Sequence, residues 1–308
     1  MNKLVAILIK WRTHLVAFHT DVRKMYNTVR LDKKHWKYHL YFFDQKLRLG
    51  VRPRIKVIKT AMYGTRSSGN VAESAIRKVA EINKEKFPKA YEVITKDFYV
   101  DDCLSGAESV EAAHQLADQI TSSIAPGGFL LKGFIFSGQD PPEHLTKNGK
   151  TVMVGGLKFS PKEDKINLKI PELNFNKKIR GRKLEIKGKF CINFTRKNCV
   201  SRVHEVFDPL GIFVPVTSGF KLDMHELTTR KLAWDDVIPD DLRNIWKDNL
   251  ELINEIGQVK FNRAVIPPDA VDLNVDTIDT ADASTKLICV AIYIRYRLKS
   301  GGFSCQLI

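Results

Sequence analysis

Short strand-like runs and longer helix-like stretches alternate along this 308-residue chain. Apolar runs predict strands at 16–18, 36–43, 51–62, 93–100, 129–136, 153–159, 275–281 and 287–297. Apolar residues at helical spacing predict helices at 71–86, 109–120, 195–230 with a break at 208–211, and 234–254. This mixture of elements predicts an α+β fold.

Two adjacent carboxylates, Asp101 and Asp102, follow the apolar run Phe98-Tyr99-Val100 and precede the small residues Ser105 and Gly106. This pattern predicts a tight β-hairpin with acidic residues at its tip. Neighbouring like charges are unfavourable unless a positive group lies on them, and a divalent ion held by oxygen ligands is the usual remedy. A solvated turn is the ordinary alternative for an Asp-Asp pair.

A third carboxylate, Asp21, ends the first predicted strand. Three carboxylates on adjacent strands of one antiparallel sheet form the oxygen-only site that Mg²⁺ prefers. Two such ions roughly 3.5–4 Å apart activate an attacking hydroxyl and stabilise the leaving oxygens in phosphoryl transfer. The sequence therefore indicates metal-assisted chemistry on a phosphate substrate.

Composition narrows the class of protein and of partner. Hydrophobic residues are 44% and charged residues 28%, which is ordinary for a globular protein, and the net charge of +15 favours a polyanionic partner, most simply nucleic acid. The basic residues are densest at 165–197. Five scattered cysteines without C-x-x-C spacing predict a reducing, intracellular setting and no structural zinc site. The apolar run at 4–9 is too short to span a membrane, and no signal peptide is expected.

Six motifs in a fixed order resemble those of the reverse transcriptases of Pao-type (BEL-Pao) long-terminal-repeat retrotransposons. Residues 18–26 resemble polymerase motif A, 64–68 motif B, 99–106 motif C, 127–132 motif D and 154–159 the primer grip; residues 203–211 resemble a hallmark segment of these elements. Gly69 departs from the pattern, because the family often has proline there.

This resemblance implies the domain plan and the partners. We expect an antiparallel-sheet polymerase palm with helices on one face over 1–160, a basic thumb or connection region over 161–266, and the truncated start of a ribonuclease H-like domain, an incomplete strand pair, over 267–308. The implied activity is RNA-directed DNA polymerisation with two Mg²⁺ ions, or Mn²⁺, on an RNA/DNA template–primer duplex and deoxynucleoside triphosphates. The implied setting is a retrotransposon polyprotein in the cytoplasm or in virus-like particles, without a membrane.

The resemblance also implies roles for individual residues. The metal ligands would be the carboxylates of Asp21, Asp101 and Asp102 and the backbone carbonyl of Val22. Tyr26 would be the steric gate under the sugar, its alternative being a core aromatic. Lys132 would lie near the triphosphate, its alternative being an exposed residue at a strand end. The contacts to the templating base pair and nucleotide would come from Arg66, Ser67 and Ser68.

The segment 275–284 has two interpretations. It resembles the first strand of a ribonuclease H domain, with Asp282 as the first metal aspartate. Asp279-Thr280-Ala281 also resembles the D-[ST]-[GA] loop of an aspartic protease. The protease of this family precedes the polymerase and no flap segment follows here, so the ribonuclease interpretation is favoured. Because the further carboxylates are missing, Asp282 is not expected to be catalytic in this chain.

The upstream fingers segment, which supplies basic residues to the triphosphate in the family, is not in this sequence. We therefore expect binding of template–primer to survive better than nucleotide incorporation. The alternative to an enzyme is a truncated or host-retained remnant that binds nucleic acid without chemistry.

Overall fold

The computed structural model describes residues 2–44, 50, 52–145, 151–170, 178–179, 182–183, 194–272 and 274–308, with only the backbone described at 178–179 and 182–183. The chain divides into two compact units, Met1–Lys147 and Asn148–Ile308. None of the helices in these ranges combines the length and the apolarity needed to cross a bilayer.

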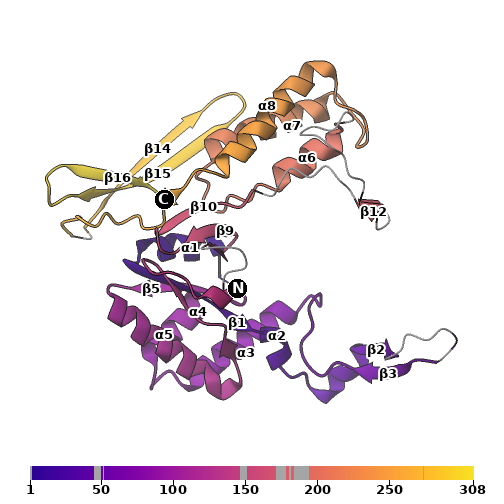
Figure 1. The fold of residues 1–308 in the computed structure, drawn as a ribbon, viewed down its shortest axis with the longest axis vertical. Coiled ribbons are helices and arrows are strands. Elements are labelled where there is room, and N and C mark those ends of the chain that lie inside the picture. The colour runs from indigo at the N-terminus through magenta and orange to yellow at the C-terminus, as the bar shows by residue number, and fades with distance from the viewer. Residues whose placement is uncertain are drawn as a thin grey trace. The chain divides into compact units, whose positions relative to one another are not determined.

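The first unit is built on one antiparallel sheet (Figure 1). Its strands lie in the order β4-β5-β1-β6, and β7 also pairs with β1. The elements in chain order are α1 Leu4–Thr13, β1 Val16–Arg23, α2 Met25–Thr28, the 3₁₀ helix η1 Lys33–Tyr38, β2 Leu40–Phe43, β3 Arg54–Val57, α3 Ser68–Ile82, α4 Pro88–Lys96, β4 Phe98–Tyr99, β5 Asp102–Ala107, α5 Val110–Ile124, η2 Ala125–Gly127, β6 Leu130–Leu131, β7 Ile135–Phe136 and η3 Glu143–Leu145.

Helices α3, α4 and α5 pack together and share a core with the sheet. Each helix contributes fully buried side chains at helical spacing, such as Ile76 from α3, Ile94 from α4 and Ile120 from α5, and these contact the cluster around Phe18 of β1. Burying each such side chain stabilises the fold by about 1.5–3 kcal/mol. The sheet is therefore held rigidly from the helical side.

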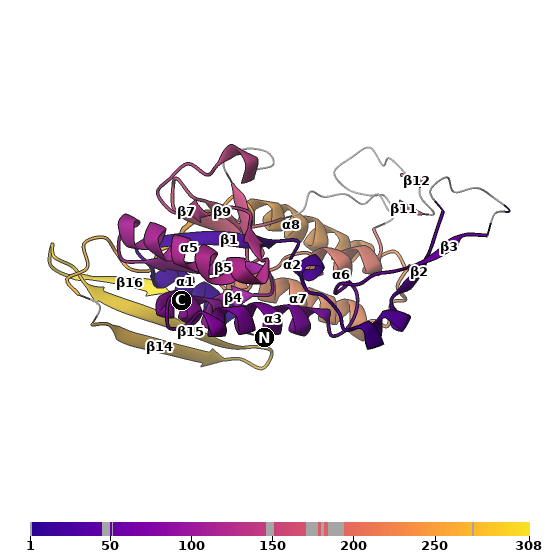
Figure 2. The same cartoon turned by 90° about the horizontal axis from the view of Figure 1, so that it is seen from below.

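The second unit contains a four-stranded antiparallel sheet, three long helices and a separate three-stranded sheet (Figures 1 and 2). The orders are β13-β10-β9-β8 and β14-β15-β16, and β11 pairs with β12. The elements are β8 Val152–Val154, β9 Leu157–Ser160, β10 Lys165–Leu168, β11 Lys178–Ile179, β12 Arg182–Lys183, α6 Arg196–His204, α7 Val214–Thr229, α8 Asp240–Ile256, β13 Phe261–Asn262, β14 Asp276–Ala283, β15 Ile288–Arg297 and β16 Phe303–Leu307.

The α+β prediction is confirmed, but five predicted strands are wrong in part. The run 51–62 is a strand only at Arg54–Val57, and the run 153–159 is two strands joined by a turn at Gly155 and Gly156. The run 36–43 is a strand only from Leu40, after a 3₁₀ helix. The run 93–100 is mostly helix α4, which begins at Pro88 and ends at Lys96. Proline after the predicted helix 71–86 suggests the end of that helix. In the structure α3 ends at Ile82, and Pro88 is the first residue of α4, where its missing N–H costs nothing. The run 129–136 forms two short strands separated at Gly133, whose φ is +123°.

The C-terminal segment contains the two predicted strands, β14 and β15, and a third strand, β16, that the sequence analysis did not anticipate. The basic residues at 165–197 are expected to contact phosphates of a nucleic acid. Most of this stretch lies outside the described residues, so this stays a prediction.

Candidate active site

Strand β1 carries Asp21 to one end of the first sheet. Phe18 and Val22 on this strand are almost fully buried, and they fix the strand against the helices. Asp21 is paired in register with Asp102 of β5, and the N–H of Val22 donates to the backbone carbonyl of Asp101 at 2.9 Å. Asp21 and Asp101 are eighty positions apart in the sequence. The fold therefore brings the three predicted carboxylates together at one end of the sheet.

Asp101 lies at the tip of the hairpin formed by β4 and β5. Tyr99 pairs with Asp102, so Val100 and Asp101 form a two-residue turn, as the sequence predicted. Val100 has a φ of +58°. A positive φ at the first turn position suits a two-residue hairpin but is unfavourable for a β-branched residue. Such strain, on the order of 1–3 kcal/mol, is typical of functional sites.

The three carboxylates repel one another, and this repulsion contributes to the pKa of Asp101. Burial raises the pKa of Asp101 above its ordinary value, and the charges of Asp21 and Asp102 raise it further. The site thus holds more negative charge than its surroundings neutralise. A bound cation is the arrangement that relieves this repulsion.

Two cationic or polar side chains, Lys132 and His19, contact the carboxylates of Asp21 and Asp102. The Nζ of Lys132 lies 2.8 Å from Oδ1 of Asp21, and the N–H of Lys132 donates to the Asp21 carbonyl at 3.0 Å. This ion pair raises the pKa of Lys132. The Nε2 of His19 lies 3.1 Å from Oδ1 of Asp102. Lys132 was expected near the triphosphate; in the structure it contacts a predicted metal ligand.

The three aspartates suit Mg²⁺, because their carboxylate oxygens are hard ligands and the backbone places all three residues at the same end of the sheet. In the ranges that the structure describes, however, no three His, Cys, Asp or Glu side chains are already arranged as a metal-binding group. The residues fit the metal in chemistry and in backbone register.

Tyr26 lies beside the carboxylates, just after the chain leaves β1. Lys24, with a φ of +51°, turns the chain into α2, where Tyr26 packs against Tyr63 with ring centroids 4.6 Å apart. Burial, the charge of Asp101 and then Tyr63 raise the pKa of Tyr26. A Cβ added to Gly69 would lie 3.7 Å from the Tyr26 hydroxyl. Tyr26 is therefore partly buried between the carboxylates and the start of α3, a position that suits the predicted gate.

The three predicted contacts to template and nucleotide differ in exposure. Arg66 and Ser67 are exposed, whereas Ser68, the first residue of α3, is buried. Ser67 occupies the N-cap position without a side-chain hydrogen bond. Arg66 and Ser67 are accessible to a ligand in this conformation, and Ser68 is not.

Two residues of this site were missed by the sequence analysis, His19 and Tyr63. His19 is two positions before Asp21, on the same face of β1, which is the signal that could have identified it. No local sequence pattern could have identified Tyr63, because only the folded chain brings it back into contact with the distant residue Tyr26.

The second unit contains two other segments that the sequence singled out. Gly155 and Gly156 both have positive φ and form the two-residue turn between β8 and β9. A Cβ on Gly156 would lie 2.5 Å from the ring of Phe207, so glycine is required for Phe207 to pack there. The predicted primer-grip hairpin and the segment 203–211 are thus in direct contact.

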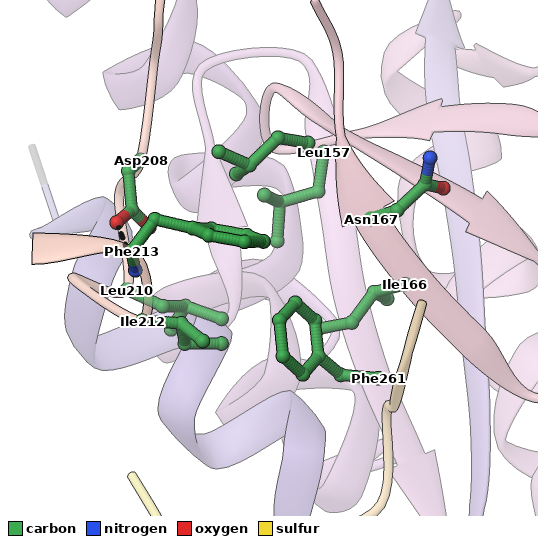
Figure 3. A pocket seen from close by; sticks show the side chains of 9 residues that line it. Leu157, Ile166, Asn167, Asp208, Leu210, Ile212, Phe213 and Phe261 are labelled. Atoms are coloured by element: carbon green, nitrogen blue, oxygen red, sulfur yellow. Dashed lines mark hydrogen bonds between the residues drawn. The ribbon is translucent and has the colours of Figure 1, made fainter. Parts of the chain in front are cut away.

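The segment after Phe207 borders a small apolar cavity (Figure 3). Asp208 accepts a hydrogen bond from the N–H of Phe213 at 2.7 Å and fixes the loop that closes it. The cavity encloses about 10 Å³, which is room for no more than one water molecule. The other lining residues are Leu157, Ile166, Asn167, Leu168, Leu210, Ile212 and Phe261.

The structure places Asp279 and Asp282 on one continuous strand, β14. Asp279 pairs with Ile292 and Asp282 with Cys289, and both aspartates are exposed. The protease interpretation required a loop at Asp279, and an eight-residue strand is found instead. In the described part of the chain, neither aspartate belongs to a cluster of three potential metal ligands.

Comparisons with known proteins define the class of fold. Two solved structures of the foamy viral protease–reverse transcriptase, one in complex with an RNA/DNA hybrid and one with double-stranded DNA, match the whole chain with TM-scores of 0.53 and 0.55. The identity is 12% in each case, so the likeness is one of fold alone. This chain spans 35% and 45% of the length of those two chains.

A family model then gives a more particular likeness. Residues 195–308 match the Pao retrotransposon-like RNaseH-like domain. This range contains the helices α6, α7 and α8 together with β13 to β16. No curated protein matches the chain. The fold is therefore similar to that of the foamy viral protease–reverse transcriptase, and residues 195–308 resemble the Pao retrotransposon-like RNaseH-like domain.

Proposed function

We propose that this chain is a fragment of a retroelement reverse transcriptase and that its first unit belongs to the polymerase part, which adds deoxynucleotides to a primer 3′-end on an RNA template. The observation that carries the proposal is the register of Asp21 with Asp102, with Asp101 at the adjacent turn, in a fold like that of a reverse transcriptase. The +15 charge of the chain supports a nucleic-acid partner.

Asp21, Asp101 and Asp102, with the carbonyl of Val22, are the residues that would hold two Mg²⁺ ions. When bound, the ions would activate the primer hydroxyl and stabilise the charge on the leaving pyrophosphate. The raised pKa of Asp101 is consistent with this role, because burial and then the charges of Asp21 and Asp102 raise it, and a cation would balance those charges. Lys132 contacts Asp21 in this structure, and its ammonium would be a counter-ion for a triphosphate bound at this site.

The neighbouring residues would position the substrates. Tyr26, packed against Tyr63, presents a rigid ring edge beside Asp101, which suits exclusion of a 2′-hydroxyl from the nucleotide pocket. Arg66 and Ser67 are exposed beside α3 and suit contact with the template strand, through charge and through a hydroxyl donor respectively.

Primer extension on an RNA template with Mg²⁺ tests the proposal. The wild-type chain is compared with Asp101→Asn plus Asp102→Asn, while duplex binding is scored in parallel. The matched control is Glu85→Gln plus Asp118→Asn, which removes the same charge from exposed positions. Extension lost only in the first variant, with binding retained, supports the proposal. Equal extension by all three proteins refutes it.

A second candidate is a protein that binds nucleic acid without chemistry. The observation that favours it is that Asp21 and Asp102 each contact another side chain, Lys132 and His19 respectively. Mn²⁺ binding followed by electron paramagnetic resonance separates the two candidates without an activity assay. Mn²⁺ bound by the wild type and not by the Asp101/Asp102 variant supports the enzyme; no specific Mn²⁺ binding, together with duplex binding, supports the second candidate.

A further inference from the structure

The hairpin that carries Asp101 and Asp102 has very short arms. Its strands are joined by two cross-strand pairs, Phe98 with Cys103 and Tyr99 with Asp102. Strand β5 is also held by β1, but β4 lies at the edge of the sheet. Because a short two-stranded hairpin is marginally stable by itself in water, the position of its tip depends on what holds β4 and the base of the hairpin.

Asp97 holds the base of this hairpin. It follows the last residue of α4, and its N–H donates to Val93 O at 2.8 Å. Its carbonyl accepts a hydrogen bond from the N–H of Leu104 at 3.1 Å, and its Oδ2 accepts one from the hydroxyl of Ser105 at 2.7 Å. Asp97 therefore joins the end of α4 to β5, four residues before Asp101.

The carboxylate of Asp97 is buried and paired with a lysine from another helix. Asp97 is only 1% exposed, and the Nζ of Lys10 on α1 lies 2.7 Å from its Oδ1 and 3.0 Å from its Oδ2. A buried charge is unfavourable unless it is paired and hydrogen-bonded. An apolar pair of similar volume often gives as much stability, so what these directional contacts add is a fixed orientation of Asp97.

Helix α1 is itself fixed to the strand that carries the third carboxylate. The residue after Lys10 is Trp11, which is fully buried, and its Nε1 donates to the carbonyl of Phe18 on β1 at 3.2 Å. The helix lies beside β4 and β5 (Figures 1 and 2). Two neighbouring residues of α1 thus connect β1, which carries Asp21, with the base of the hairpin at Asp97.

We propose that Lys10 and Asp97 are positioning residues, whose ion pair braces the hairpin against α1 and thereby fixes Asp101 and Asp102 relative to Asp21. Neither residue contacts metal or substrate; both act through the carboxylates. Groups that orient metal ligands typically contribute about ten-fold to a hundred-fold in metal affinity. The inference rests on the proposed function, because it concerns the same metal site.

Mn²⁺ binding to the full chain, followed by electron paramagnetic resonance, is the first measurement. Lys10→Met removes the charge and keeps the length of the side chain. It should weaken Mn²⁺ binding by about ten-fold, the lower end of the range, because Asp97 keeps its contact with Ser105. Lys10→Arg keeps a cation that can reach both carboxylate oxygens and should bind Mn²⁺ like the wild type.

Primer extension gives a second comparison of the same two variants. Lys10→Met should raise the half-saturating Mg²⁺ concentration by a similar factor, about ten-fold, and leave the Michaelis constant for the primer–template unchanged. Lys10→Arg should change neither value. A loss of folded protein alone would lower the rate without changing the Mg²⁺ dependence.

A double variant protects the test against a folding defect. Lys10→Met alone leaves the buried carboxylate of Asp97 without its cation, which is strongly destabilising. Lys10→Met plus Asp97→Asn removes both charges and should have a melting temperature closer to that of the wild type. It should nevertheless bind Mn²⁺ about as weakly as Lys10→Met, because the ion pair is still missing.

Two control variants separate positioning from charge and from stability. Lys96→Met removes the same charge beside Asp97 in the sequence, where the exposed Lys96 pairs with Glu92 at 2.7 Å. Ile120→Val truncates a fully buried side chain of α5 and lowers the melting temperature of the same unit. Both variants should bind Mn²⁺ like the wild type.

Hydrogen exchange without metal reports on the hairpin directly. The N–H of Val22 donates to the carbonyl of Asp101, so its exchange rate shows whether the tip is in place. This amide should exchange faster in Lys10→Met than in Lys10→Arg. The amides in the middle of α5 should exchange at the same rate in both variants.

Three results would overturn the proposal. The first is equal Mn²⁺ affinity in Lys10→Met and Lys10→Arg, and the second is an equal loss of affinity in Lys96→Met or Ile120→Val. The third is an unchanged exchange rate of the Val22 amide in Lys10→Met. A wild type that neither binds Mn²⁺ nor extends a primer refutes the proposed function instead, and hydrogen exchange still decides whether the ion pair holds the hairpin.

Discussion

His19 provides the sharpest test of how the candidate site is held together. Its Nε2 is 3.1 Å from Oδ1 of Asp102, and its ring is 7% exposed between β1 and its neighbours. His19 and Asp102 are diagonal neighbours on one face of the sheet, because His19 pairs with Leu104 and Asp21 pairs with Asp102. We expect His19 to fix the orientation of the Asp102 carboxylate.

The size of the effect follows from the contact. A hydrogen bond to a charged group contributes about 1.5–3 kcal/mol net. The side chain of Asp102 is 32% exposed, so water replaces part of the lost contact and the lower end applies. His19→Leu should therefore raise the half-saturating Mg²⁺ concentration for primer extension by about ten-fold. The Michaelis constant for the primer–template should not change.

Two amide variants make the prediction specific. His19→Gln places an amide nitrogen near the position of Nε2 and should restore most of the Mg²⁺ affinity, whereas His19→Asn places it near Nδ1 and should behave like His19→Leu. The Mg²⁺-dependent rise in melting temperature gives the same comparison without activity. If glutamine and leucine variants show the same Mg²⁺ dependence, the contact with Asp102 has no role in positioning and this reasoning is wrong.

Three further predictions concern stability. The raised pKa of Asp101 means that the folded protein binds its proton more tightly than the unfolded chain, so stability falls as pH rises through that pKa. Asp101→Asn should therefore raise the melting temperature measured without metal at pH 7, and this increase should disappear below pH ~4, the ordinary carboxyl range. Added Mg²⁺ should raise the melting temperature of the wild type only. Gly106→Ala should destabilise the first unit by about 1–3 kcal/mol in urea unfolding, because its Cβ would lie 2.4 Å from the carbonyl oxygen of Val16. The control is Gly219→Ala, which has no atom within 4 Å and no positive φ and should not destabilise the protein. Arg263→Leu should cost about 3–5 kcal/mol in the same measurement, since Arg263 is fully buried with two 2.7 Å contacts to Asp164.

The carboxylate cluster could be predicted from sequence because it depends on local rules. Asp101 and Asp102 follow a short apolar run, and a two-residue turn places both at a hairpin tip. Asp21 follows another short apolar run and lies two residues before the end of β1, where a polar side chain can reach solvent. The resemblance supplied the pairing of these strands, which no local pattern specifies. The register of Asp21 with Asp102 then fixed the geometry.

Helix α4 could not be distinguished from a strand by the same rules. Val93 and Ile94 are adjacent apolar residues before Phe98, and such a run fits either a buried strand or one face of a short helix. Tertiary packing decides, because Ala90, Val93 and Ile94 all face the core only in the helical conformation. Contacts between distant segments, such as Tyr26 with Tyr63, were likewise beyond a local pattern.

Lys132 offsets part of the repulsion among the three carboxylates. Its ammonium lies 2.8 Å from Asp21, and the charges of all three aspartates contribute to the rise in its pKa. With 48% of its side chain exposed, Lys132 loses little packing when it moves away. The ion pair is therefore weak enough to exchange for a divalent ion, because an exposed pair contributes about 1 kcal/mol or less. A lysine at this position both protects the fold from the repulsion of the carboxylates and leaves the site open to a cation of higher charge.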